Sequence, residues 1–293
     1  MRRDQSRLHD NTSGTYAAGV KNDDMSTIAD FPCRVCGATD MRLYYTLGRD
    51  RRFRHYQCPN CALVNYDLST GLDQTQYEDT YHDPRDGELK YNRDKDQSYR
   101  ALARLAQPPG RFLDIGCGNG RLLCVAMEAG WQVKGLELSA NMAEYVRDTL
   151  GVEVMVGNFL DVTPDADDAG AYDAVTLRHV IEHLPDSLGA MDRISSYLKP
   201  GGYLLLEMPN IESMTKKWSR LIVGAGLHQR KFSDDFMAGH CNEFCQKSMR
   251  FLADKTGFEL VRWETYSSKP LMNWFYTRVP IGSKARAILR RIE

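Results

Sequence analysis

The sequence predicts an α/β protein that carries a small cysteine-rich module ahead of its main domain. From Arg111 onward, short apolar stretches alternate with amphipathic ones, and this order of strand and helix produces a parallel sheet covered on both faces. A glycine-rich turn, "DIGCGNG", follows the first of these strands. Nearer the N-terminus, two Cys-x-x-Cys pairs are separated by 21 residues.

Length and charge restrict the classes of function. A chain of 293 residues suits one large domain with appendages or two modest domains. The 38 basic and 39 acidic side chains leave a net charge of -1, so no whole-chain field attracts nucleic acid or an anionic membrane. Because no signal-peptide core and no apolar run of 18 residues occurs, we expect a cytoplasmic protein with reduced cysteines and a small-molecule partner.

Residues 1–30 are polar and lack periodicity, which predicts a disordered tail. In residues 31–66, the two cysteine pairs bracket an alternating stretch that is typical of a hairpin, and together they predict a zinc ribbon. Four protein ligands leave no open coordination position, so we expect a structural zinc; a catalytic metal or cysteines that only fill a core are the alternatives. The predicted ligands are Cys33, Cys36, Cys58 and Cys61.

Residues 67–110 form a charged collar with a predicted helix over residues 90–106, which two prolines end. The main domain is expected over residues 111–293. Its predicted strands are 111–115, 132–137, 153–156, 172–177, 202–208, 258–265 and 271–278.

The glycine-rich turn predicts a ligand site, because glycine lets the backbone turn sharply and approach a ligand closely before a helix begins. Such turns also serve dinucleotides and phosphates, but the spacing G-x-G-x-x-G and a following Lys are both absent. The next strand ends in Glu137, whose carboxylate can accept both hydroxyls of a ribose. Farther on, "GNFLD" places Asn158 and Phe159 where an adenine ring would lie.

The motifs "LDIGCGNG", "GLELS", "GNFLD", "YDAVTLRHVIEHLPD" and "LKPGGYLLLEMPN" closely resemble those of class I S-adenosylmethionine-dependent methyltransferases, over about residues 111–265. The resemblance implies a Rossmann-like sheet of seven strands, the last antiparallel, with the cofactor at the carboxyl ends of the first strands. Asp114 and the glycine loop would hold the methionine end, Glu137 the ribose and Leu138 one adenine face. Many family members have Asp where this chain has Asn158. The residues that the resemblance assigns to the cofactor are Asp114, Gly116, Cys117, Gly118, Gly120, Glu137, Leu138, Asn158, Phe159 and Arg178.

The stretch "HVIEH" matches the H-x-x-E-H of inverted zinc proteases, but its place after the fourth strand argues against that activity. Ubiquinone-pathway O-methyltransferases resemble it with E-x-x-E-H, which implies a divalent ion such as magnesium at His179, Glu182 and His183. The simpler interpretation is a helix start whose histidines line the cleft or bind nearby backbone.

Residues 211–246 exceed the length of a simple crossover and predict a lid over the acceptor. His240, near the end of this segment, is the predicted catalytic base, since a neutral imidazole accepts a proton near pH 7. His183 and His179 are rivals, and a capping role for His240 at the helix near Gln246 is the alternative. Tyr77 and Tyr81 would share a helix face, as a wall over cofactor and acceptor or as ordinary packing.

The predicted function is methyl transfer to a small acceptor. A cysteine module followed by a collar with tyrosines resembles methyltransferases that act on sugars and other small metabolites, which favours a sugar nucleotide or related metabolite. An RNA methyltransferase whose ribbon grips the substrate, and a scaffold that only binds the cofactor, are the alternatives. The sequence does not distinguish oxygen, nitrogen and carbon as acceptor atoms, or the oligomeric state.

Overall fold

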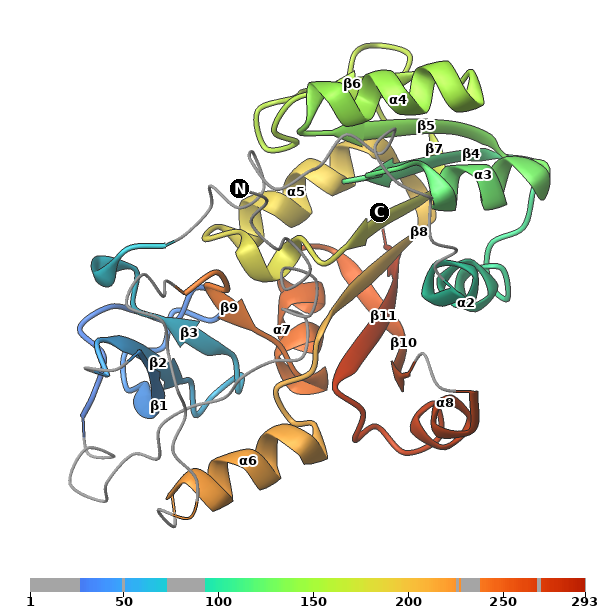
Figure 1. The fold of residues 1–293 in the computed structure, drawn as a ribbon. Coiled ribbons are helices and arrows are strands. Elements are labelled where there is room, and N and C mark those ends of the chain that lie inside the picture. The colour runs from blue at the N-terminus through green and yellow to red at the C-terminus, as the bar shows by residue number, and fades with distance from the viewer. Residues whose placement is uncertain are drawn as a thin grey trace, which may run out of the picture.

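The structure is a computed structural model, which describes residues 27–48, 51–72, 93–224, 227, 238–267 and 270–292. These residues form two sheets with helices packed around them (Figure 1). The predicted tail up to residue 26, Tyr77 and Tyr81, and much of the predicted lid lie outside the described residues. Within those ranges, the helices are too short or too polar to span a bilayer.

The larger sheet comprises β4 (Arg111–Ile115), β5 (Gln132–Glu137), β6 (Val154–Val156), β7 (Tyr172–Arg178), β8 (Leu198–Pro209), β10 (Phe258–Tyr266) and β11 (Lys284–Arg291). Their order across the sheet is β10-β11-β8-β7-β4-β5-β6. Neighbours from β6 to β8 are parallel, and β11 is antiparallel to both β8 and β10. The predicted α/β sheet of seven strands with an antiparallel last strand is confirmed.

Helices cover both faces of this sheet (Figure 1). One buried cluster contains side chains of α2 (Arg93–Leu102), α3 (Arg121–Glu128) and α4 (Ala140–Leu150), and another contains those of α5 (Ser187–Tyr197) and α7 (Gln246–Lys255). Adjacent strand residues alternate between the clusters: Phe112 packs in the first and Leu113 in the second. This alternation is what a sheet buried on both faces requires.

The prediction of a strand over residues 271–278 is wrong. That stretch lies in and just after helix α8 (Pro270–Tyr276), and β11 takes the place in the sheet. Its aromatic residues favour a strand, but Pro270 occupies the first helical position, where its missing N–H costs no hydrogen bond. In β11, Ala287 and Leu289 point to the same face of the sheet, and both are fully buried.

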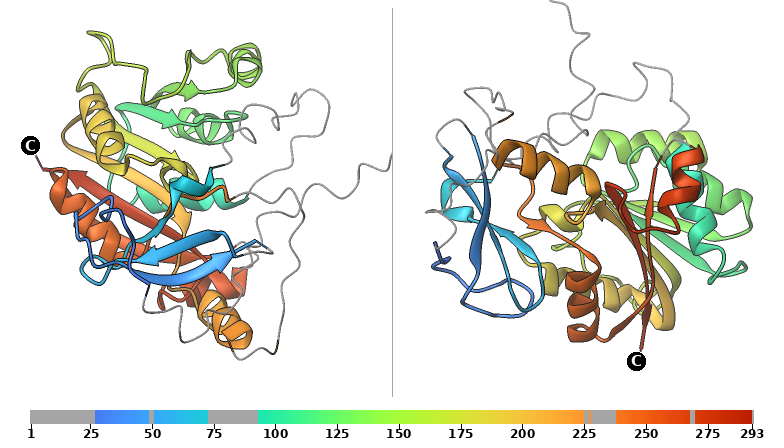
Figure 2. Two further views of the ribbon diagram at one scale, coloured as in Figure 1. Left: turned by 90° about the vertical axis from the view of Figure 1, so that its left-hand side faces the viewer. Right: turned by 90° about the horizontal axis from the view of Figure 1, so that it is seen from below.

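The smaller sheet contains β1 (Arg42–Leu47), β2 (Phe53–Gln57), β3 (Val64–Tyr66) and β9 (Asn242–Glu243), in that order. Ile28 pairs with Arg42, so the module begins ahead of residue 31. Apolar side chains of the module share one buried cluster with α5 and α7, and Figures 1 and 2 show the small sheet on that side of the molecule. The described residues also form η2 (Leu68–Thr70), η4 (Ile181–His183) and α6 (Met214–Gly224).

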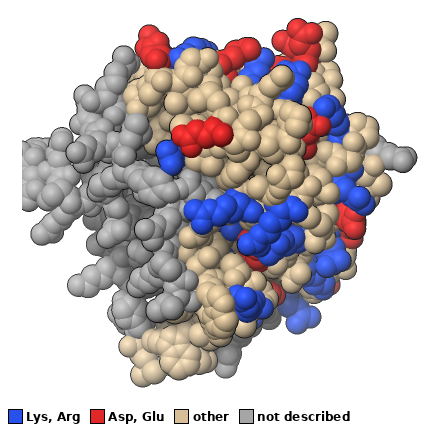
Figure 3. All heavy atoms as spheres, turned by 90° about the vertical axis from the view of Figure 1, so that its right-hand side faces the viewer, with Lys and Arg blue, Asp and Glu red and all other residues tan. Residues whose placement is uncertain are grey.

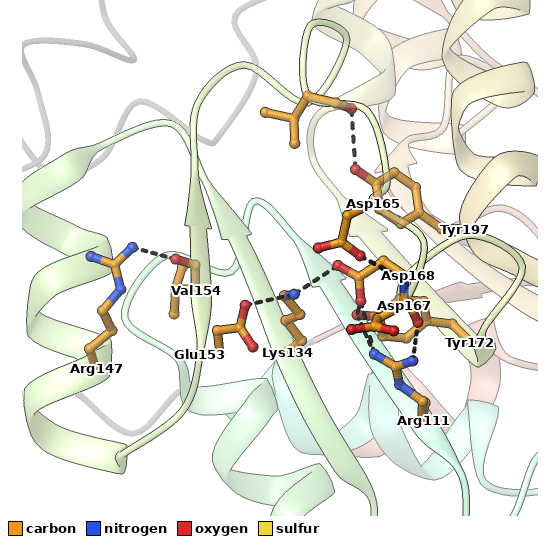
Figure 4. A network of polar contacts seen from close by, with 11 residues as sticks. Arg111, Lys134, Arg147, Glu153, Val154, Asp165, Asp167, Asp168, Tyr172 and Tyr197 are labelled. Carbon is orange, nitrogen blue, oxygen red and sulfur yellow. Dashed lines mark hydrogen bonds and ion pairs between the residues drawn. The ribbon is translucent and has the colours of Figure 1, made fainter.

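A buried polar network ties the amino ends of the parallel strands together (Figure 4). Asp168 accepts hydrogen bonds from Lys134 at 2.7 Å, from Arg111 at 2.9 Å and from the Tyr172 hydroxyl at 2.7 Å. Burial raises the pKa of Asp168, but these partners outweigh it and hold the pKa below its usual value. Because the network lies at the edge opposite the glycine-rich turn, it contributes to the fold rather than to a ligand site.

Candidate functional site at the carboxyl edge of the sheet

The glycine-rich turn between β4 and α3 leaves open space at the carboxyl edge of the sheet. Gly118 has φ of 52° and Gly120 has φ of 72°, in the left-handed region that favours glycine. A Cβ added at Gly118 would meet no other heavy atom of the described residues within 4 Å. One added at Gly120 would lie 2.9 Å from Cδ1 of Leu150. Packing therefore requires Gly120, whereas Gly118 borders space that a ligand can use.

Glu137, the last residue of β5, links this turn to the next one. Its Oε2 accepts from the backbone N–H of Gly118 at 2.8 Å, and its Oε1 accepts from that of Ser139 at 3.0 Å. The carboxylate is buried and holds the glycine-rich turn against the start of α4, which Ser139 caps. Since a carboxylate offers about four lone-pair sites, two bonds leave capacity for ligand hydroxyls.

Three further predicted cofactor residues lie near this edge. The Leu138 side chain is 43% exposed, as a surface for a flat ring would need. Asn158 is exposed, and its Oδ1 accepts from the N–H of Leu160 at 3.1 Å, which leaves one lone pair. The ring of Phe159 packs in the core, so this position offers its main chain rather than its side chain.

Two further predicted residues, Asp114 and Cys117, are buried, and Arg178 is partly exposed. Asp114 is fully buried and accepts from the Thr176 hydroxyl at 2.6 Å. Cys117 is buried among the helices on one face of the sheet. Arg178 ends β7 with its side chain 9% exposed, 3.9 Å from the Glu207 carboxylate. Asp114 and Cys117 thus support the turn, whereas Arg178 lies at the same edge as the open space.

Two predicted catalytic histidines meet at η4, directly after β7. The rings of His183 and His240 are 4.6 Å apart at an interplanar angle of 72°. Nδ1 of His183 lies 2.7 Å from the carbonyl oxygen of Gly239, so it donates there and leaves Nε2 free of its proton when the ring is neutral. Glu182 joins them: one ligand atom from each of the three residues lies within 4.8 Å of the others.

Two members of this cluster have shifted pKa values. Burial lowers the pKa of His240 to about 4, although Glu182 acts in the opposite direction, so the ring is neutral near pH 7. Burial raises the pKa of Glu182, but the hydrogen bond with His179 and the charges of the neighbouring histidines lower it by more. The pKa is therefore below its usual value, and this carboxylate is ionised. Its Oε2 has no hydrogen-bond partner in the part of the chain that the structure describes.

His179 is placed differently from its two rivals. Its φ is 56°, an unusual value for a residue other than glycine, and its N–H donates to the carbonyl of Glu207 at 2.7 Å. Its Nδ1 is 3.4 Å from Oε1 of Glu182, and its side chain is 43% exposed. His179 therefore contacts the carboxylate from the solvent side, and such strained residues occur often at functional sites.

A second buried charge cluster was not foreseen from the sequence. Glu243 of β9 accepts from the Tyr45 hydroxyl at 2.6 Å and from Nζ of Lys216 at 3.1 Å, and all three are buried. Although burial raises the pKa of Glu243, Lys216 and its other neighbours lower it to about 2. These residues come from three distant segments, so no spacing in the sequence could indicate their contact.

The segment around His240 differs from a simple lid. Residues 241–245 are buried, and β9 within them belongs to the small sheet. The alternative of His240 as a helix cap is wrong, because Cys245 caps α7 and its N–H donates to Oγ of Ser248 at 2.9 Å. Cys241 and Cys245 are both free, buried thiols.

The four predicted metal ligands converge at two turns of the small module. Sγ of Cys33 lies 3.5 Å from that of Cys61, and Sγ of Cys36 lies 3.3 Å from that of Cys58. All four sulfur atoms lie within 4.8 Å of one another. Zinc bound to four thiolates at about 2.3 Å places them roughly 3.8 Å apart. The arrangement fits one zinc ion with no open coordination position.

Comparison with known proteins identifies similar sequences. A family model described as a methyltransferase domain matches residues 89–262. The ubiquinone biosynthesis O-methyltransferase of Xanthomonas campestris pv. campestris is 35% identical over 113 residues, which are 37% of this chain and 46% of that protein. The enzyme of the same name from Cronobacter sakazakii is 33% identical over 121 residues, or 39% and 48% of the two chains. The chain thus spans about half the length of the curated relatives it matches.

Solved structures share the fold. Phosphoethanolamine N-methyltransferase 2 from Haemonchus contortus, in complex with S-adenosyl-L-methionine, is similar with a TM-score of 0.53 and 19% identity, over 78% of this chain and 60% of that one. The PH0226 protein from Pyrococcus horikoshii is similar with a TM-score of 0.51 and 15% identity, over 74% and 95%. At these identities, the likeness concerns the fold alone.

Proposed function

Because the chain belongs to the methyltransferase domain family, we propose that it transfers a methyl group from S-adenosyl-L-methionine to a small-molecule acceptor. One observation carries the proposal: Glu137 joins the glycine-rich turn to the start of α4 and still has lone pairs to offer beside open space at Gly118. Open α/β sheets bind their ligands at this carboxyl edge.

The roles follow from what each residue presents. Glu137 accepts the ribose hydroxyls, Leu138 covers one adenine face, and Asn158 accepts from the adenine amino group with its remaining lone pair. Gly116 to Gly120 approach the methionine end through their backbone, supported from inside by Asp114 and Cys117. Arg178 faces the same end and offers Nε, which lacks a hydrogen-bond partner among the described residues.

The acceptor is proposed to lie by the cluster of Glu182, His183 and His240. S-adenosyl-L-methionine supplies an already activated methyl group, so the protein must align the acceptor, exclude water and receive a proton where the acceptor has one to lose. His240 is the proposed base, because it lies against His183 and Glu182 at this edge and its ring is neutral near pH 7. The ionised Glu182 would stabilise the positive charge that the ring gains, and His183 holds Gly239 beside it.

The names of the curated relatives favour oxygen as the acceptor atom, and a sugar nucleotide or related metabolite stays the proposed substrate class. On the face in Figure 3, Lys and Arg side chains gather with Asp and Glu side chains beside them. This mixture of signs agrees with the net charge of -1 and does not favour RNA, which is tested as the alternative acceptor.

The four-cysteine centre is proposed to hold structural zinc. Cys33, Cys36, Cys58 and Cys61 would bind it as thiolates and hold the two turns of the module together. Zinc supplies folding energy to a segment that is too short to bury a sufficient core alone.

The decisive experiment incubates the purified protein with methyl-labelled S-adenosyl-L-methionine and a panel of sugar nucleotides, small phenols and total RNA. Label in a sugar nucleotide or phenol supports the proposal, and label in RNA replaces the substrate class. Cofactor binding without transfer to any panel member would favour a scaffold. A folded protein that fails to bind the cofactor at millimolar concentration would overturn the proposal.

A further inference from the structure

The backbone on either side of His240 is held from two directions. On the side of the main domain, the N–H of Cys241 donates to the carbonyl of Glu182 at 2.9 Å. Nδ2 of Asn242 donates to the carbonyl of Leu184 at 2.7 Å. On the other side, β9 pairs with β3 of the cysteine module. The position of His240 relative to Glu182 therefore depends on both the sheet domain and the module.

Arg34 makes the charged contact from the module to this segment. Its Nη1 donates to the carbonyl of Cys241 at 2.9 Å and lies 3.4 Å from Oδ1 of Asn242. Its Nη2 donates to the carbonyl of Tyr66 at 2.5 Å. The guanidinium therefore joins the end of β3 to Cys241, the residue that directly follows His240, beside the main-chain bond in which the N–H of Tyr66 donates to the same carbonyl at 3.0 Å.

The main chain of Arg34, from which its guanidinium extends, is held next to the cysteine centre. Arg34 follows Cys33 within the first Cys-x-x-Cys turn, and its N–H donates to Oδ1 of Asn65 at 3.0 Å. Nδ2 of Asn65 in turn lies 3.6 Å from Sγ of Cys33. The turn, its arginine and a thiol thus form one connected unit, which changes shape if the thiols separate.

We propose that Arg34 is a positioning residue that couples the four-cysteine centre to the histidine cluster. It holds the main chain at Cys241 so that His240 stays against His183 and Glu182. The catalytic meaning of this coupling rests on the proposed function, but the coupling itself is a property of the fold. The metal centre then contributes to the acceptor site through position, not by binding the substrate.

Arginine suits this role better than lysine. A planar guanidinium reaches two carbonyl oxygens in fixed directions, while an ammonium group is a point charge on a flexible stem. An Arg34→Lys chain therefore keeps the charge and loses one of the two directed bonds. The exchange rate in Arg34→Lys should therefore lie between those of the native chain and Arg34→Ala. If only the charge mattered, Arg34→Lys would behave like the native chain.

The test uses the full zinc-loaded chain and two measurements. Hydrogen exchange followed by mass spectrometry should show residues 238–245 exchanging at least about tenfold faster in Arg34→Ala, with Arg34→Lys intermediate. The imidazole NMR signal of His240, assigned by its loss in His240→Asn, should shift in the same order. Arg54→Ala is the matched control, because Arg54 is an exposed arginine of the same module.

Zinc content and binding of S-adenosylhomocysteine are measured on every chain. Native-like exchange and an unmoved His240 signal in zinc-loaded Arg34→Ala would overturn the proposal. If Arg34→Ala loses its zinc, the comparison is made with Arg34→Lys instead. The proposal is then overturned if residues 238–245 exchange as fast in Arg34→Lys as in the control Arg54→Ala. Failure of the native chain to bind S-adenosylhomocysteine sinks the proposed function alone, since the exchange comparison needs no cofactor.

Discussion

Replacing Glu137 with Gln tests the proposed cofactor site with little change in side-chain volume. The amide keeps one acceptor oxygen, but its NH₂ group would face the N–H of Gly118 or of Ser139, which Glu137 now accepts at 2.8 Å and 3.0 Å. A hydrogen bond to a charged group contributes about 1.5–3 kcal/mol. The free energy of unfolding should therefore fall by about that amount, which urea titration measures.

Cofactor affinity should fall separately, because the amide can accept from only one of the two ribose hydroxyls. Loss of one such bond, at about 1.5–3 kcal/mol, corresponds to a roughly 10- to 150-fold higher Kd. Titration calorimetry with S-adenosyl-L-methionine and S-adenosylhomocysteine measures it. Glu153→Gln is the control. The Glu153 side chain is 71% exposed, and its ion pair with Lys134 should contribute little to stability.

The two measurements separate two claims about Glu137. If stability falls as expected but the Kd of Glu137→Gln stays within about twofold of the native value, the ribose role is refuted and only the link between the turns survives. If neither changes, the hydrogen bonds of Glu137 contribute nothing measurable, and the reasoning that starts from this carboxylate fails.

Three further predictions follow from the same geometry. Gly118→Val should abolish cofactor binding in calorimetry, because its side chain enters the open space and φ of 52° is strained for valine; retained binding would contradict the placement of the methionine end. Cys58→Ser should lower zinc from one per chain and destabilise the module, and elemental analysis that finds no zinc in anaerobically purified native protein refutes the site. His240→Asn should slow turnover by roughly 10²- to 10⁴-fold with cofactor affinity unchanged, and near-normal turnover rules out His240 as the base. Chelation that stops the native reaction, with added magnesium restoring it, would instead favour a divalent ion at Glu182.

Contiguous motifs made the main domain and its glycine-rich turn predictable. A strand, a glycine turn and a helix follow one another within a few residues around Gly118, so local propensity and spacing carry the information. The cysteine quartet was predictable for the same reason, because each pair lies within one turn. The error at residues 271–278 arose where aromatic residues favoured a strand and one proline started a helix.

The acceptor side was less predictable, since its contacts join residues that are far apart along the chain. Tyr45 and Glu243 are separated by 198 positions, and Arg34 and Cys241 by 207. Each residue alone is an ordinary polar residue of a loop or strand. The pairing of β9 with β3 helps to bring them together, and no periodicity reveals a strand of two residues.

If the acceptor lies by the histidine cluster, as proposed, the small module helps to hold that site in place. Methyl transfer depends on alignment, in which a displacement of about 1 Å can be costly, yet β9 is too short to hold His240 in place by its own ladder. The segment gains fixed positions at Cys241, which contacts Arg34 and the main chain of Glu182, and at Glu243, which pairs with the buried Lys216. Under the proposed coupling, the four-cysteine centre would affect the chemistry through the position of His240. For that reason the exchange rate of residues 238–245, rather than zinc content alone, measures what the module contributes.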